Sequence, residues 1–424
     1  MRRRAGKGTD RYVQACRVGV VAAMLLSAAC ARTPLTPAAA TPAADARIAR
    51  VSLGRVSLAT ISATGPFRLV DDGGRVVAQA DSGARIPLSA VRGALQMQER
   101  RAARVIAGPV RVVAAARAFA VFDNRRYRGD LLLLPADSMV EVVNRVELEA
   151  YLRGVVPREI GVRRANERAA IEAQAVAARS YAVTRLGNRS RAYDLSATTS
   201  DQVYGGVDAE YAWSDTAVAA TAGLVLTYEG RVVSAPYHST CGGSTAEATE
   251  VWRSRGEPFL QRVSDRIPGS DRYYCDVAPR FRWERSWRAD SLTAIVERYV
   301  RSYAQVPAGP VGAVRDVAVE SRTASGRAAI TVIETDRGRF RLQANDVRYV
   351  LRTSGGELLN STYFSPDVTA GPDGKLSRLT IRGTGYGHGV GMCQWGAIGR
   401  ARAGQDFRTI LRTYFPGTSV ARAY

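Results

Sequence analysis

The feature that most limits the fold of this chain is a change in hydrophobic period near residue 144. Between residues 48 and 143, short β-branched runs are separated by turn residues, as at residues 67–70 (FRLV) before the turn 71–74 (DDGG). Short strands at this spacing predict an all-β region. After residue 144 the apolar residues recur with a helical period, which predicts helices at 144–152 and 165–186. The two patterns together predict an α+β fold.

The remaining pattern mixes both periods and shows no internal repeat. We expect helices at residues 210–221, 290–303, 393–403 and 406–414, and strands at 225–228, 232–237, 314–319, 328–334, 339–342 and 376–383. Hydrophobic residues make up 46% of the chain, which is enough for a buried core.

The N-terminus predicts export. Residues 1–4 (MRRR) are basic, residues 18–26 are apolar but too few to cross a bilayer, and small residues follow, so residues 1–29 are predicted to be a signal peptide. The stretch 26–30 (LSAAC) is similar to a lipoprotein signal, which favours lipidation of Cys30 and membrane attachment through that lipid. Simple cleavage near Ala29 is the alternative. Residues 30–45, rich in Ala, Pro and Thr, would form a flexible linker.

The charge balance is strongly basic, with 60 Lys and Arg against 39 Asp and Glu, a net charge of +21. Such a surface attracts polyanions, among them nucleic acids, anionic lipids and cell-wall polymers, although the excess can also be ordinary solvated surface. Basic runs interleaved with aromatic residues, which a nucleic-acid groove needs, do not occur, and export also excludes a nucleic-acid partner.

Both histidines of the chain, His238 and His388, lie in glycine-rich segments within five residues of a cysteine. Outside the leader there are three cysteines, for which two arrangements remain open. His238, Cys241, Cys275 and Cys393 can ligate a structural zinc ion, with His388 as a further candidate. Alternatively Cys241 and Cys275 form a disulfide while Cys393 stays a buried thiol, and export favours this arrangement. No other cofactor is expected.

One carboxylate has an unusual sequence environment. Glu159 lies in residues 155–160 (VVPREI), just after a proline and between two predicted helices. The apolar neighbours Val155, Val156 and Ile160 are expected to desolvate this carboxylate and raise its pKa, as a general acid requires at neutral pH. A helix cap or a surface carboxylate is the alternative.

Several motifs occur in an order that resembles the SpoIID/LytB family. They are residues 144–159 (NRVELEAYLRGVVPRE), 172–182 (EAQAVAARSYA), 201–206 (DQVYGG), 241–245 (CGGST), 250–252 (EVW), 383–397 (GTGYGHGVGMCQWGA) and 414–418 (YFPGT). The resemblance covers residues 111–424, with an insertion near residues 285–375. Residues 46–110 carry no motif of the family and are expected to form a β-rich N-terminal extension.

The resemblance implies a lytic transglycosylase that cuts peptidoglycan glycan strands between N-acetylmuramic acid and N-acetylglucosamine and leaves 1,6-anhydro ends. It implies a glycan-binding cleft enclosed by strands and helices, with Glu159 as the single acid and base. The residues implied to line that cleft are Gln174, Arg179, Gln202, Tyr204, Ser239, Gly242, Gly243, Thr245, His388 and Gln394. The family often has serine where Cys241 and Cys393 stand here. The alternative function is a non-catalytic wall-binding activator of a peptidoglycan amidase.

Overall fold

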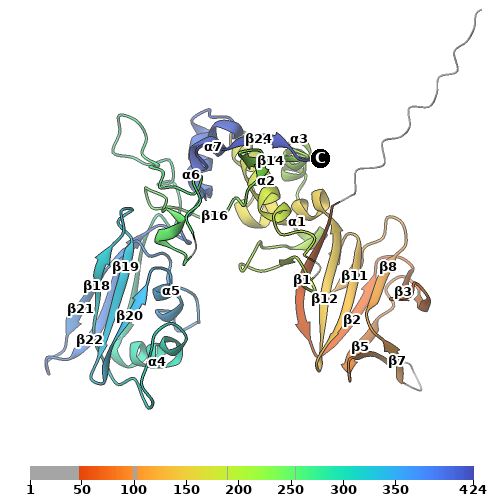
Figure 1. Ribbon diagram of the computed structural model, residues 1–424, viewed down its shortest axis with the longest axis horizontal. Helices are drawn as coiled ribbons and strands as arrows, with labels where there is room; N and C mark the ends of the chain where they lie inside the picture. The colour runs from red at the N-terminus through yellow and green to blue at the C-terminus, as the bar shows by residue number, and fades with distance from the viewer. Residues whose placement is uncertain (1–46, 99–102, 189, 254) are drawn as a thin grey trace, which may run out of the picture. The chain divides into compact units, whose positions relative to one another are not determined.

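The computed structural model describes residues 47–98, 103–188, 190–253 and 255–424 (Figure 1). The predicted signal peptide, the linker at residues 30–45 and Cys30 lie outside the described residues. Residues 46–424 belong to one compact unit. Mixed helices and strands confirm the α+β class. Within the described ranges, no helix has both the length and the apolar character needed to cross a membrane.

Two sheets contain the strands of residues 48–147, where the short β-branched runs predicted an all-β region; their strand pairs are antiparallel except for β13, which pairs in parallel with β1. A seven-stranded sheet has the order β13-β1-β12-β11-β8-β3-β4, and a six-stranded sheet has the order β10-β9-β2-β5-β6-β7. The bounds are β1 Ile48–Val56, β2 Leu58–Ala63, β3 Phe67–Asp71, β4 Val76–Ala80, β5 Ile86–Val91, β6 Ala94–Gln98, β7 Ala103–Ala107, β8 Val110–Ala114, β9 Ala120–Phe122, β10 Arg125–Tyr127, β11 Asp130–Ala136, β12 Met139–Glu147 and β13 Leu195–Ser196.

The sheet order corrects the domain boundary predicted at residue 110. β1 pairs along its length with β12, and β8 pairs with β11. Strands from both sides of residue 110 therefore share one sheet, and residues 46–110 are not a separate extension. Local periodicity carries no information on which distant strands pair, so the sequence could not place this boundary.

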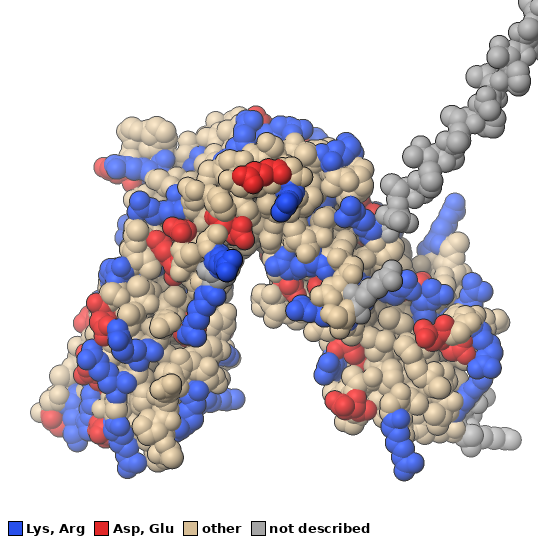
Figure 2. Space-filling view, viewed as in Figure 1, with Lys and Arg blue, Asp and Glu red and all other residues tan. Residues whose placement is uncertain are grey.

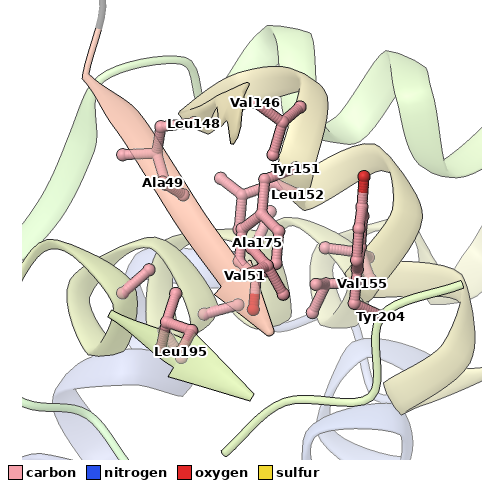
Figure 3. Close-up of a cluster of buried hydrophobic side chains, with 14 of the residues drawn as sticks. Ala49, Val51, Val146, Leu148, Tyr151, Leu152, Val155, Ala175, Leu195 and Tyr204 are labelled. Atoms are coloured by element: carbon pink, nitrogen blue, oxygen red, sulfur yellow. The ribbon is translucent and has the colours of Figure 1, made fainter. Parts of the chain in front are cut away.

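The first helix begins directly after β12, and other helices, outside the predicted insertion, lie later in the chain. Their bounds are α1 Leu148–Ile160, α2 Arg168–Val183, α3 Ala212–Ala220, α6 Gln394–Arg402 and α7 Phe407–Tyr414, with short 3₁₀ segments at Ala165–Glu167, Gly206–Ala209, Ala248–Glu250 and Val300–Ser302. The helix predicted at 144–152 begins later, because residues up to Glu147 remain in β12. The Glu147 side chain caps α1 by accepting from the Ala150 N–H at 2.9 Å. Figure 3 shows the core that results, in which Tyr151 and Leu152 of α1 pack near Val51 of β1.

Three short strand groups bring distant segments together around these helices. β14 (Leu224–Tyr228) pairs with β15 (Arg231–Val232), which is shorter than the strand predicted at 232–237, and with β24 (Ser419–Arg422). β16 (Tyr237–His238) pairs in parallel with β23 (Met392–Cys393). This last pairing places the two histidine- and cysteine-bearing segments side by side, although about 150 residues separate them.

A second hydrophobic core lies between Trp287 and Ile381, in the part of the chain where an insertion was predicted. Its elements are β17 Arg282–Arg288, α4 Ala289–Tyr299, β18 Val314–Arg322, β19 Ala328–Thr335, β20 Gly338–Gln343, α5 Asp346–Val350, β21 Phe364–Ala370 and β22 Leu376–Thr384. They form two three-stranded sheets, β17-β22-β21 and β18-β19-β20. Figure 2 shows Lys and Arg side chains spread among acidic ones over the visible face, without a single continuous basic patch.

Candidate functional site

Glu159 lies in the last turn of α1, not in a connection between helices as the sequence predicted. The helix continues through Pro157 and ends at Gly161, whose N–H donates to the Pro157 carbonyl. The side chain of Glu159 is partly exposed, and its Oε1 accepts a hydrogen bond of 2.6 Å from the Val203 N–H. Burial raises the pKa of this carboxyl, and the Val203 N–H, the Gln394 amide and the Arg158 charge offset only part of that rise. The direction of the pKa shift is the predicted one.

Three predicted substrate residues, all glutamines, are linked to the surroundings of this carboxyl: Gln394 through its own amide, Gln174 through Gln394, and Gln202 as the neighbour of Val203. Gln394 is the first residue of α6, and its Nε2 donates to Oε1 of Gln174 on α2 at 3.2 Å. Gln202 precedes Val203, the residue that holds Glu159. Gln174 and Gln202 are fully buried and Gln394 is nearly so. Residues from four of the seven motifs, far apart in sequence, are therefore linked around Glu159.

Tyr237 belongs to the same group, although no role was predicted for it. Its hydroxyl accepts from Gln202 Nε2 at 3.0 Å, and Gln202 Oε1 accepts from the Tyr151 hydroxyl at 3.1 Å. Burial first, and then the charge of Glu159, raise the pKa of Tyr237 well above its ordinary value, so the phenol stays neutral. Its position directly before His238, in a segment already singled out, was the only available signal.

The two histidines lie against each other, with ring centroids 5.4 Å apart. Both ring nitrogens of His388 are used by the backbone. Nδ1 accepts from the Val390 N–H at 3.1 Å and Nε2 donates to the Tyr237 carbonyl at 2.9 Å, which defines a neutral tautomer. Burial lowers the pKa of His388. The ring centroids of Trp252 and His388 are 5.1 Å apart, and both ring nitrogens of His388 already have backbone partners.

The predicted loop residues 239–245 chiefly hold the backbone in place. Ser239 is partly exposed, and its carbonyl accepts from the Trp395 N–H at 3.0 Å. Gly242 has a φ of 77°, and a Cβ there would lie 2.6 Å from Thr384 Oγ1, so only glycine fits this approach. Gly243 packs on Tyr273 in the same way. Thr245 is buried, and its hydroxyl donates to the Gln261 carbonyl at 3.2 Å. Contact of these residues with a glycan stays a prediction.

Arg179 and Tyr204 lie in the protein interior. Arg179 is fully buried on α2, and its guanidinium makes two hydrogen bonds to Glu149, of 2.8 and 2.7 Å. Tyr204 is also buried; its hydroxyl donates to Asn144 Oδ1 at 2.9 Å, and its ring lies close to Val155 in Figure 3. Both side chains therefore have partners inside the fold, and their contact with a substrate stays a prediction.

The three cysteines are buried and free, which differs from the favoured disulfide. The Sγ atoms of Cys241 and Cys275 are 3.4 Å apart, and Cys393 lies beside them. The fourth side chain of this cluster is Asp265, which replaces the predicted His238. His238 instead donates from Nδ1 to the Val390 carbonyl at 3.1 Å.

Comparison with known proteins identifies the family. A family model described as stage II sporulation protein matches residues 136–228, and a model described as a domain of unknown function matches residues 270–391. The chain belongs to the SpoIID/LytB family. It is 32% identical to the amidase enhancer of Bacillus subtilis (strain 168) over 63% of this chain and 40% of that protein, so the match spans less than half of that relative.

Two further relatives match over most of their own length. An uncharacterized protein of Brachyspira hyodysenteriae is 31% identical over 69% of this chain and 72% of that protein. The stage II sporulation protein D of Bacillus amyloliquefaciens is 28% identical over 66% of this chain and 76% of that protein.

Proposed function

We propose that this protein is an exported lytic transglycosylase that cleaves peptidoglycan glycan strands, with Glu159 as general acid and base. The observation that carries the proposal is the environment of the Glu159 carboxyl. Its carboxyl is partly exposed, held at one oxygen by the Val203 N–H, and has a pKa raised by burial. A carboxyl whose pKa is raised towards neutrality can both give and take a proton at the working pH.

The proposed reaction needs only this one acid. The protonated Glu159 donates to the glycosidic oxygen while the bond from that oxygen to C1 of N-acetylmuramic acid breaks. The 6-hydroxyl of the same sugar then attacks C1 and closes the 1,6-anhydro ring, and its proton returns to the Glu159 carboxylate. Ordinary glycosidases require a second carboxylate as nucleophile or base. Here the sugar's own hydroxyl takes that part.

The surroundings of Glu159 support a single-acid scheme. Asp201 lies two residues before Val203, the residue that contacts Glu159. Its Oδ1 accepts from the Tyr181 hydroxyl at 2.9 Å, and its Oδ2 accepts from the Ser196 N–H at 2.9 Å. Arg185 forms an ion pair with it at 3.5 Å. Both oxygens of this carboxylate therefore have partners within the protein, which gives Asp201 a structural role. The amide of Gln394 adjoins Glu159 and stabilises the ionised form that exists between the two proton transfers.

The proposal includes the setting in which the enzyme works. The signal peptide would export the chain to the cell envelope, and a lipid on Cys30 would hold it at the membrane, facing the periplasm or the wall. Its substrate and partner would be the glycan strand, and the chemistry requires no cofactor. The names of the relatives support a role at the cell wall.

The test is mass spectrometry of purified, peptide-stripped and intact glycan strands after incubation with residues 46–424. We expect 1,6-anhydro-terminated fragments from the wild type and none from Glu159→Gln, which keeps the shape of the side chain but cannot donate a proton. The matched control is Asp201→Asn, which should still release anhydro ends. If the wild type releases no fragments from either substrate, the proposed activity is wrong.

The similarity to a protein named amidase enhancer favours one second candidate, a non-catalytic activator of a peptidoglycan amidase. An activator would increase the release of stem peptides by an added amidase, and Glu159→Gln would increase it equally. The transglycosylase proposal instead expects Glu159→Gln to lose its effect on glycan length.

A further inference from the structure

Four buried side chains with metal-ligating atoms form a cluster, and one of them, Cys393, directly precedes Gln394 of the candidate site. The Sγ atoms of Cys241, Cys275 and Cys393 and one carboxylate oxygen of Asp265 all lie within 4.8 Å of one another. All four residues have no exposed surface. They come from separate segments, so the fold, and not local sequence spacing, brings them together.

The orientation of Asp265 is the one that a metal ligand needs. Its Oδ1 accepts from the Tyr414 hydroxyl at 2.7 Å and from Arg400 Nη2 at 3.1 Å. Its Oδ2 faces the thiols and lies 3.8 Å from Cys241 Sγ. Outer partners that fix one oxygen and leave the other for an ion are a general feature of metal sites.

Cys393 has the surroundings of a thiolate. Its Sγ lies 3.2 Å from the Cys241 N–H and 3.2 Å from the Gly396 N–H, and both donate to it. Gly396 also makes room for the aspartate, because a Cβ there would lie 2.4 Å from Asp265 Oδ2. Backbone donors of this kind stabilise a negatively charged sulfur, which is the form that binds metals.

The distances fit a tetrahedral zinc ion. Zinc–sulfur bonds of about 2.3 Å and zinc–oxygen bonds of about 2.0 Å place two sulfur ligands about 3.8 Å apart and a sulfur and an oxygen about 3.5 Å apart. In the cluster, the Sγ atoms of Cys241 and Cys275 are 3.4 Å apart, and Cys241 Sγ lies 3.8 Å from Asp265 Oδ2. A disulfide needs about 2.05 Å between the sulfurs.

We propose that Cys241, Asp265, Cys275 and Cys393 bind one Zn²⁺ ion in a closed structural site. Four protein ligands leave no coordination position for substrate, which separates this role from zinc catalysis.

The proposed ion would also organise the candidate site. Cys241 precedes the Gly242-Gly243 loop, and Cys393 caps α6 directly before Gln394, whose amide adjoins Glu159. One metal would therefore fix two segments that β16 and β23 bring together. The metal proposal itself does not depend on the proposed glycan cleavage, since its test measures metal and thiols only.

The test counts zinc and thiols in residues 46–424, exported to the periplasm and purified without chelators. This unit contains only the three cysteines of the cluster. We expect about one zinc per chain by elemental analysis and three thiols that react after denaturation in the presence of a chelator. One reactive thiol and no zinc would show the Cys241–Cys275 disulfide and overturn the proposal, and so would three thiols without metal.

Two further measurements identify the ligands. Replacement of zinc by Co²⁺ in the wild-type protein should give sulfur-to-cobalt charge-transfer absorption and the intense visible bands of a tetrahedral site, and octahedral bands would contradict the proposal. Asp265→Asn should lower the zinc content, whereas the matched variant His238→Asn should keep it. The opposite pattern would make His238 the ligand and refute the four-residue site. Because Asp265→Asn can also weaken the fold, the cobalt spectrum serves as a test that needs no variant.

Discussion

Replacing Arg179 with methionine tests whether this residue supports the fold or binds the substrate. The guanidinium is fully buried, donates twice to Glu149 and once to the Leu224 carbonyl at 3.0 Å. Arg179→Met fills much of the volume but leaves the Glu149 carboxylate with only the Gly223 N–H and the Tyr424 hydroxyl as donors. Removing one partner of a buried ion pair costs about 3–5 kcal/mol. We expect a loss of about 3 kcal/mol, because Glu149 is 22% exposed and keeps two donors.

The loss should depend on pH in a defined direction. In the wild type, burial raises the pKa of Glu149. Arg179 and the other donors lower that pKa by more than burial raises it, so the pKa lies below its ordinary value. This carboxylate contributes stability above its unfolded pKa of about 4.3, and the contribution is lost as the pH falls through the folded pKa. In Arg179→Met burial dominates and the pKa of Glu149 rises. The stability difference between the two proteins should therefore be largest at neutral pH and shrink as the pH falls, first through the raised pKa of the variant and then through the lowered pKa of the wild type.

Urea unfolding of residues 46–424 at pH 7 and pH 4, followed by circular dichroism, measures both effects. The double variant Arg179→Met/Glu149→Leu removes both charges and should recover most of the lost stability. If Arg179→Met unfolds like the wild type at both pH values and instead loses glycan binding, the structural role is refuted and the cleft role is restored.

Three further predictions follow from single contacts. Gln394→Leu removes an amide that lowers the pKa of Glu159, so the alkaline limb of the cleavage rate against pH should move to higher pH; an unchanged limb would contradict the contact. Gly396→Ala should cost about 1–3 kcal/mol in urea unfolding, because the new Cβ would meet the Tyr414 hydroxyl at 2.0 Å, whereas Gly355→Ala, with its nearest atom at 3.8 Å, should be neutral. Removal of the buried Tyr204 hydroxyl in Tyr204→Phe should cost about 1–3 kcal/mol without changing glycan binding, and weaker binding would contradict its interior position.

Local patterns in the sequence predicted local features of the structure. The helical period over residues 165–186 predicted α2 to within a few residues, and the short β-branched runs between turn residues predicted the strands of the N-terminal sheets. The apolar neighbours of Glu159 predicted the direction of its pKa shift. They are buried residues of the same helix, and burial is the main cause of the raised pKa.

Features that depend on distant pairing could not be predicted in this way. The partner of β1 is β12, about 90 residues later, and no periodic signal identifies it. Arg179 was expected in the cleft because it lies in a family motif, but its partner Glu149 lies on another helix and turns it inward. Asp265 joins the cysteines only through the fold, so a pattern of cysteines and histidines selected His238 in its place.

The measurement that tests the central claim most directly follows the source of the oxygen in the cleavage product. Peptide-stripped glycan strands are incubated with residues 46–424 in water labelled with oxygen-18, and the new ends are examined by mass spectrometry. Because the sugar's own 6-hydroxyl is the proposed nucleophile, we predict anhydro ends without the label and no product from Glu159→Gln. Labelled reducing ends would show that water is the nucleophile, and equal product from Glu159→Gln would show that this carboxyl is not the acid.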